Sequence, residues 1–133
     1  IAMHEQFKPV WIYDMLADRP DPILYQMVRL EHIENMLMTL AAINRVYMPY
    51  DFKHLAAFID ELTIKPNLLW QDINIIFNSP PPQAKRLILN LGDTIHDQLE
   101  KHFPHIDIQV AREWFHYARP KHEQSPLVKE TNT

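Results

Sequence analysis

Apolar residues recur along most of the chain with the three- and four-residue spacing of amphipathic helices, and no segment alternates like a strand. The longest pattern covers residues 22–47, where the polar residues Gln26, Arg29, Glu31, His32 and Asn35 fall outside one apolar stripe. That stripe comprises Ile23, Met27, Leu30, Ile33, Leu37, Leu40, Ala41 and Asn44. Residues 36–43 are apolar nearly all round, so we expect this helix to be the central one, with Leu37, Leu40 and Ala41 deeply buried.

Shorter patterns with the same helical spacing lie on either side of this segment in the sequence. They cover residues 10–17, 52–62, 68–78, 83–102 and about 107–118. Asp21 suits an N-cap and Pro22 the first helical position, while Asp107 can cap the last helix. The sequence therefore predicts an all-α bundle of about five to six helices with short, proline-rich links. We expect one domain over residues 1–118 and a polar, flexible tail over residues 119–133.

Composition restricts the classes of protein that this chain can represent. The chain has 133 residues, a formal net charge of −4 and no cysteine, which excludes disulfides and thiolate chemistry. The charge gives no reason to expect binding to nucleic acid or to a membrane. No apolar run approaches the roughly 20 residues that cross a bilayer, so we expect a cytoplasmic protein. Because the chain begins at Ile1, we expect a fragment or the C-terminal domain of a longer protein.

Gly92 is the single glycine, and it lies inside the helix predicted for residues 83–102. One isolated glycine cannot build a phosphate-binding loop. In a helix interior it costs about 1 kcal/mol relative to alanine, so we expect a close helix crossing at this point.

Candidate metal ligands occur on the same predicted helix, where Asp93, His96 and Glu100 share a face by spacing. Such spacing alone is a weak signal for a metal site. We interpret these residues as a solvated polar face opposite the apolar stripe, and we predict no metal site and no catalytic residue in this chain.

The most unusual segment is residues 44–54, in which several hydrogen-bonding side chains gather at the end of the longest helix. They are Asn44, Arg45, Tyr47, Lys53 and His54. In a structural interpretation, Asn44 ties down the chain reversal and Arg45 neutralises the end of the helix dipole. In a functional one, the cluster binds an anionic or polyol ligand, or docks another domain.

This segment resembles the C-terminal helical domain of bacterial nucleotidyltransferase-like proteins of the polymerase-β superfamily. The family's Asn-Arg-x-Tyr-x-Pro pattern corresponds to residues 44–49, and its Leu-x-x-x-Pro-x-Leu stretch to residues 62–68. Its His-x-Pro-x-x-Asp turn corresponds to residues 102–107. The likeness covers roughly residues 20–118, with Lys53-His54 in place of the more usual Lys-Trp.

The resemblance implies an accessory domain that lines the acceptor-substrate side of a transferase. The family's Gly-Ser motif and Asp-x-Asp pair are absent from the chain, so Mg²⁺ and a nucleoside triphosphate are implied only for a separate catalytic domain. Asn44, Arg45, Tyr47, Lys53 and His54 would then bind substrate or dock that domain. The alternative is a stand-alone helical interaction module that binds another protein or a second copy of itself.

Overall fold

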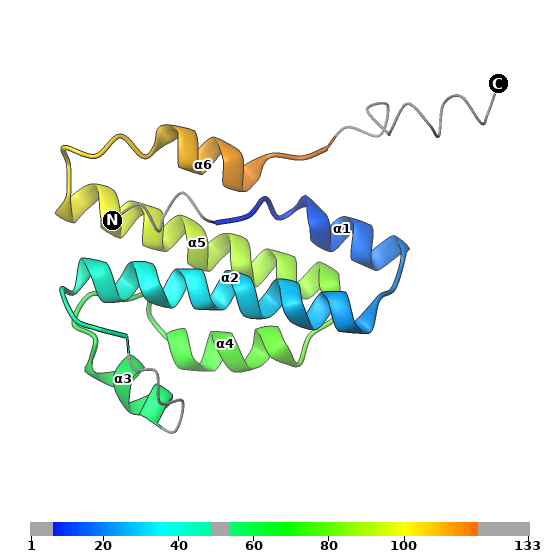
Figure 1. Ribbon diagram of the computed structural model, residues 1–133, viewed down its shortest axis with the longest axis horizontal. Coiled ribbons are helices and arrows are strands. Elements are labelled where there is room, and N and C mark those ends of the chain that lie inside the picture. Colours follow the sequence, from blue (N-terminus) through cyan, green and yellow to red (C-terminus); the bar gives the residue numbers. More distant parts are fainter. Residues whose placement is uncertain (1–6, 49–53, 120–133) are drawn as a thin grey trace.

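In a computed structural model of the protein, the structure describes residues 7–48 and 54–119, and every regular element in these ranges is a helix (Figure 1). The helices are α1 (Trp11–Asp18), α2 (Pro22–Ile43), α3 (Leu55–Glu61), α4 (Leu69–Phe77), α5 (Pro81–His102) and α6 (Gln109–His116). The predicted all-α bundle is thereby confirmed. Most of the predicted tail lies outside the described residues.

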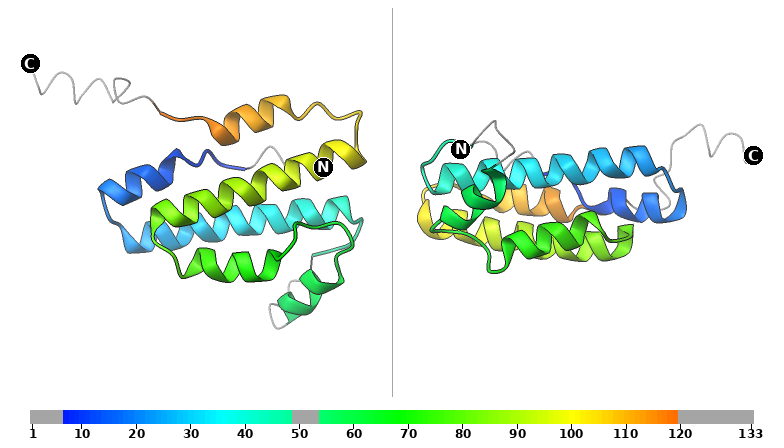
Figure 2. Two further views of the ribbon diagram at one scale, coloured as in Figure 1. Left: turned by 180° about the vertical axis from the view of Figure 1, so that it is seen from behind. Right: turned by 90° about the horizontal axis from the view of Figure 1, so that it is seen from below.

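The helices form an up-and-down bundle with one short helix at its side. α2 and α5 run in the same direction, while α1, α4 and α6 run the opposite way (Figure 1). α3 packs against α4 near the end of the bundle where α2 finishes (Figure 2). α5 packs against α1, α2, α4 and α6, and is therefore the central helix. The prediction that the longest apolar segment would be central is wrong, because α5 packs against four other helices, whereas α2 packs chiefly against α4 and α5.

Local sequence signals position several helix ends. The Asp21 side chain accepts a hydrogen bond from the Leu24 N–H at 3.0 Å, and Pro22 takes the first helical position as predicted. Pro81 opens α5 in the same way, so that helix begins two residues before the predicted start at Gln83. Asp107 accepts from the Gln109 N–H at 3.0 Å and stabilises the start of α6.

The core draws on every helix, and its deepest part includes the second half of α2. Leu37, Leu40 and Ala41 are buried there, as the sequence predicts. The stripe of α5 is also buried as predicted, with Ala84, Ile88, Leu91, Ile95 and Leu99 directed inward.

The first half of α2 is turned the other way from the prediction. Ile23, Met27 and Leu30 were expected in the core, but they are 76%, 63% and 56% exposed. Arg29 and His32, which were expected outside the apolar stripe, are instead 4% and 1% exposed. Two polar side chains are therefore buried in this half of the helix, while three apolar side chains of the predicted stripe are exposed.

Gly92 is the point of close approach between α5 and α6. A methyl group at this position would overlap the ring of Phe115, which is fully buried. The close helix crossing expected from the sequence is therefore present. The Phe115 ring occupies the space that a side chain at position 92 would fill.

Gly92→Ala should lower the free energy of unfolding by about 1–2 kcal/mol, because the new methyl group overfills a packed contact. Helix propensity alone predicts the opposite sign, a gain of about 1 kcal/mol. Urea denaturation monitored by circular dichroism distinguishes the two. In a Phe115→Leu background the same glycine substitution should become neutral or stabilising. A stabilising effect in the parent chain would contradict the packing.

Candidate functional site

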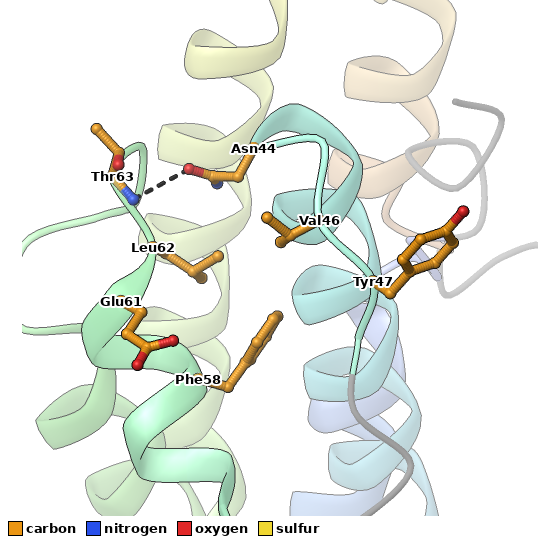
Figure 3. A pocket seen from close by; sticks show the side chains of 7 residues that line it. All are labelled: Asn44, Val46, Tyr47, Phe58, Glu61, Leu62 and Thr63. Atoms are coloured by element: carbon orange, nitrogen blue, oxygen red, sulfur yellow. Dashed lines mark hydrogen bonds between the residues drawn. The ribbon is translucent and has the colours of Figure 1, made fainter.

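The end of α2 is tied to the segment after α3 by the side chain of Asn44. Its Nδ2 donates to the carbonyl oxygens of Leu40 and Ile64 at 2.7 and 2.8 Å. Its Oδ1 accepts from the N–H groups of Thr63 and Ile64 at 3.1 and 2.8 Å (Figure 3). These four bonds use every donor and acceptor position of the amide. The geometry therefore favours a structural role for Asn44 over a role in binding a ligand.

Arg45 terminates α2 in a left-handed conformation. Its φ angle is 56°, and its N–H donates to the Ala42 carbonyl at 3.1 Å, while the Val46 N–H reaches back to the Ala41 carbonyl at 2.9 Å. This pair of bonds is the Schellman motif, in which glycine is the usual residue at the left-handed position. The Arg45 guanidinium carbon lies 6.0 Å from the centroid of the Phe103 ring. The helix therefore ends at Ile43, and not at Tyr47 as predicted.

A small hollow lies between the end of α2 and α3, and Figure 3 shows its lining. Its volume is about 210 Å³, and it is lined by Asn44, Val46, Tyr47, Phe58, Glu61, Leu62 and Thr63. Among the described residues of this lining, Glu61 alone carries a charge. Ligand pockets usually enclose about 300–1,000 Å³, and an anion would be repelled by a carboxylate. The hollow does not support the interpretation of this segment as an anion site.

Of the remaining predicted site residues, Tyr47 alone is among the described residues that line this hollow. Tyr47 is 98% exposed, and its ring is directed away from Phe58 (Figure 3). His54 is exposed at the start of α3, and Lys53 lies outside the described residues. The structure thus places Asn44 and Tyr47 on one hollow without Arg45 or His54. Docking of another domain by Tyr47 stays a prediction.

The prediction of a solvated polar face on α5 is wrong for His96. It is fully buried, with its ring centroid 4.9 Å from that of Phe7 and 5.7 Å from that of Phe115. Asp93 and Glu100 lie on the surface instead, so the three residues do not share a site. Within residues 7–48 and 54–119, no three potential metal ligands come together.

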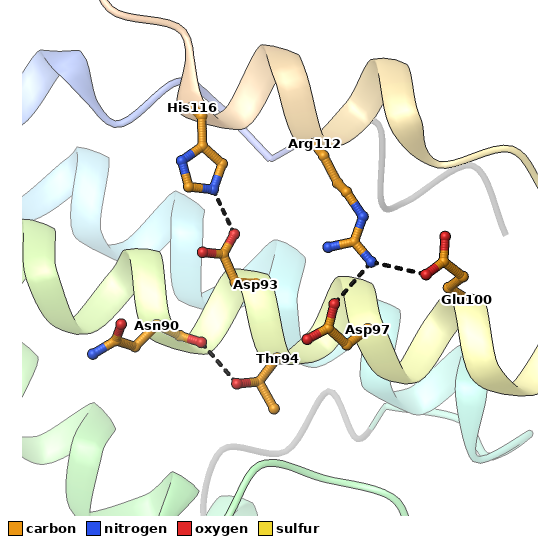
Figure 4. Close-up of polar contacts among 7 residues, drawn as sticks. All are labelled: Asn90, Asp93, Thr94, Asp97, Glu100, Arg112 and His116. Carbon is orange, nitrogen blue, oxygen red and sulfur yellow. Dashed lines mark hydrogen bonds and ion pairs between the residues drawn. The ribbon is translucent and has the colours of Figure 1, made fainter.

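The exposed acids of α5 hold α6 in place (Figure 4). The His116 Nε2 lies 2.6 Å from an Asp93 oxygen, and the Arg112 guanidinium lies 2.8 and 3.4 Å from the carboxylates of Asp97 and Glu100. Exposed pairs of this kind contribute about 0–1 kcal/mol each. They explain the polar face of α5 as a structural contact between helices.

Two side chains on the inward face of α2 hold the end of α4. The Tyr25 hydroxyl donates to the Ser79 carbonyl at 2.6 Å, and the Arg29 Nη1 donates to the Ile76 carbonyl at 3.1 Å. The guanidinium carbon of Arg29 lies 3.7 Å from the centroid of the Tyr25 ring. A cation beside the last carbonyls of a helix is stabilised by the helix dipole. These main-chain and aromatic contacts offset part of the cost of burying Arg29.

His32 occupies the same inward face and links α2 to α1 and to the segment before it. Its Nε2 lies 2.9 Å from the Lys8 carbonyl, and its Nδ1 lies 2.7 Å from the Tyr13 hydroxyl. Because a carbonyl only accepts, Nε2 carries the proton, and Nδ1 accepts from the tyrosine. Burial lowers the pKa of His32 below its ordinary value, since the charged ring would lose its hydration. The neutral imidazole is the form that this site holds.

The outward face of the first half of α2 is the surface that the sequence prediction missed. We call Ile23, Met27 and Leu30 the α2 face. Beside it, between α1 and α2, lies a hollow of about 310 Å³ with largely apolar walls, which include Trp11, Leu24 and Val28. Exposed apolar side chains beside an apolar hollow are typical of a site of protein interaction. The α2 face is therefore the candidate functional site.

Across the described ranges, no helix combines the length and the apolar character needed to cross a bilayer. Comparison of the chain with protein-family models, with curated proteins and with solved structures finds no match.

Arg45→Gly should raise the free energy of unfolding by up to about 1 kcal/mol, because glycine adopts the left-handed conformation without the steric cost of a Cβ. Arg45→Ala keeps the Cβ and is the matched control, with an expected change within about 0.5 kcal/mol. Urea denaturation measures both variants. A loss of stability in the glycine variant would instead show that the contact of Arg45 with Phe103 outweighs the backbone strain.

Stability should fall with acidification below about pH 6.5, the ordinary pKa of histidine, because the unfolded chain then binds a proton that folded His32 does not accept. Above that pH the imidazole is neutral in both states, so its titration does not change stability. Below it, the slope contributed by this residue approaches about 1.4 kcal/mol per pH unit until the pKa of the folded state is reached.

Denaturation midpoints between pH 7.5 and pH 5 for the parent chain and for His32→Gln test this dependence. The His32→Gln variant should lose the contribution that this one histidine makes to the pH dependence of stability. Gln26→Ala, at an exposed position of the same helix and without a titrating side chain, is the matched control and should keep the slope of the parent. Identical slopes for all three proteins would contradict the assignment of this pH dependence to His32.

Proposed function

We propose that this chain is a non-catalytic helical docking domain, which works by packing the α2 face against another protein domain. The observation that carries the proposal is the inverted first half of α2, where Ile23, Met27 and Leu30 are exposed while Arg29 and His32 are buried. Covering about 100 Å² of apolar surface contributes about 2.5 kcal/mol, so a partner that covers this face gains binding energy.

The resemblance of residues 44–49 and 102–107 to a nucleotidyltransferase helical domain gives the proposal its candidate partner. In that version of the proposal, the partner is a catalytic domain with a Gly-Ser motif and an Asp-x-Asp pair. That domain would bind Mg²⁺ and the nucleoside triphosphate, and this chain would supply a wall of the acceptor site. The helical architecture is compatible with such a role.

The supporting geometry also argues against chemistry in this chain. Two polar side chains inside the fold are engaged in main-chain contacts: Asn44 with Leu40, Thr63 and Ile64, and Arg29 with Ile76. A catalytic group must reach a reacting atom, but these side chains are already directed at the backbone. A docking role requires only surface, and the α2 face supplies it.

Photo-crosslinking in cells of the source organism tests the proposal. With benzoyl-phenylalanine in place of Met27, we expect a covalent adduct with a protein that contains the Gly-Ser and Asp-x-Asp motifs. The same replacement at Ile75, an exposed apolar position on α4, is the matched control and should give no such adduct. Mass spectrometry identifies the partner.

The outcomes separate the two versions of the proposal. An adduct from position 27 with a protein that lacks these motifs would leave an interaction module with no link to nucleotide transfer. The absence of a specific adduct from position 27, or equal adducts from positions 27 and 75, would refute the docking function itself.

A further inference from the structure

The α2 face has a chemical character that specifies the kind of element that can cover it. Resting on the docking function proposed above, we propose that the α2 face binds an amphipathic helix of the partner whose apolar stripe is flanked by lysine or arginine side chains. The proposal depends on the shape of the surface and on the charges at its two ends.

The shape of this surface suits a helix. Ile23, Met27 and Leu30 follow i, i+4, i+7 spacing, so they form one ridge along α2. The hollow of about 310 Å³ between α1 and α2 runs beside that ridge, with Leu24 and Val28 of α2 on its wall. A ridge next to an apolar hollow is the arrangement that receives an amphipathic helix through anchors spaced three, four and seven residues apart.

Carboxylates dominate both ends of the surface. Asp18 and Asp21 precede the ridge, and Glu31 and Glu34 follow it, all four at exposed positions. Glu31 lies 3.9 Å from the Lys8 ammonium, and Arg19 is a second cation near the first end. In the part of the chain that the structure describes, four carboxylates thus lie at the ends of the ridge with two cations near them, and the surface favours positive charge in whatever binds it.

The helix itself offers no exposed cation. Arg29 is its only basic residue apart from His32, and both are buried on the opposite face. The exposed positions of α2 therefore combine apolar side chains with Gln26, Glu31 and Glu34. A basic side chain on the partner would meet a carboxylate at either end of the ridge without displacing an existing cation of α2.

Self-association through this face is disfavoured by the same charges. In an antiparallel pair of α2 helices, Asp18 and Asp21 of one copy would lie near Glu31 and Glu34 of the other. In a parallel pair, each acidic end would meet its own copy. Like charges in direct opposition destabilise an interface, so a second copy is a poor occupant.

An anionic membrane surface is disfavoured for a related reason. Helices that lie on membranes carry lysine and arginine beside their apolar face, whereas α2 carries glutamate there. A basic amphipathic helix of a protein partner combines both complementary features, an apolar stripe and positive flanks.

A pair of labelled helical peptides of about 18 residues, long enough to cover the ridge, tests the inference with the full chain. Both carry the same leucine stripe; one has lysine at the flanking positions and the other has glutamate. We expect the lysine peptide to bind at least about tenfold more tightly in fluorescence anisotropy, a preference that should shrink as salt is raised. Equal affinity for both peptides, or binding of neither, would overturn the proposal.

Two substitutions locate the binding on the chain. Met27→Ser should weaken binding of the lysine peptide by about tenfold or more, and Glu34→Lys should reduce the preference for lysine over glutamate. Val110→Ser and Glu113→Lys place the same changes at exposed positions of α6 and should leave binding unchanged. All four positions are exposed, so thermal midpoints close to that of the parent verify the fold. Loss of binding in the α6 variants, or none in Met27→Ser, would contradict the site.

Light scattering of the chain alone tests whether a second copy of the chain covers the α2 face. A concentration-dependent dimer that Met27→Ser abolishes would assign the α2 face to a second copy. Sedimentation with phosphatidylserine vesicles, abolished by the same variant, would assign it to a membrane, and either result would overturn the inference.

The same variants distinguish this inference from the docking function. If the natural partner crosslinks at position 27 and Glu34→Lys leaves that adduct unchanged, the docking function stands and the basic helix is wrong. If position 27 gives no adduct at all, the docking function itself fails.

Discussion

The rotation of α2 about its own axis is fixed by three polar side chains that each bind a main-chain carbonyl. Tyr25 and Arg29 bind the carbonyls of Ser79 and Ile76 at the end of α4, and His32 binds that of Lys8. These three side chains share one face of the helix by i, i+4, i+7 spacing. Turning α2 to bury Ile23, Met27 and Leu30 would move these side chains into solvent and leave the carbonyls that they bind without partners, and a buried carbonyl without a partner costs about 1–3 kcal/mol. The exposure of Ile23, Met27 and Leu30 is a consequence of that anchoring.

The same contacts determine how the rest of the bundle is placed. The carbonyls that Tyr25 and Arg29 bind lie at the end of α4, directly before Pro81 opens α5. Holding α4 against α2 therefore also sets where the central helix begins. From that start, Gly92 comes beside Phe115, and the missing side chain lets α6 approach α5 closely. A local anchor on α2 is thus linked through α4 and α5 to the packing of the last helix.

Some of this structure could be predicted from sequence, and the reason differs between α5 and α2. In α5 the apolar and polar residues separate cleanly, so Ile88, Leu91 and Leu99 were placed correctly in the core. In α2 both faces carry apolar residues over its second half, and the first half carries one apolar and one polar face. The rule that apolar residues face inward then selects the wrong side. The carbonyls that reverse this orientation belong to Ser79 and Lys8. Along the chain, Ser79 lies 54 residues from Tyr25, and Lys8 lies 24 residues from His32.

The hydrogen-bonding segment at the end of α2 illustrates a related limit of the sequence. Its donors predict a binding site, but the Asn44 amide is saturated by backbone groups of residues 40, 63 and 64. Pairing with residues 63 and 64 requires the chain to return past α3, which spacing along the sequence does not reveal. The left-handed Arg45 gave no signal either, because glycine is the residue that marks such a helix end.

The separation of the two faces of α2 also determines how the domain could bind a partner. The inward face packs against α5 and α4 and binds α1 and the segment before α1, so the helix is positioned before anything binds. A partner that covers Ile23, Met27 and Leu30 meets a preformed ridge, and little conformational entropy is lost on the side of this chain. Because the anchoring and the exposed ridge use different side chains of one helix, the outward residues can change without disturbing the inward contacts. Specificity for a partner can therefore vary on the outward face while the fold is maintained by the inward one.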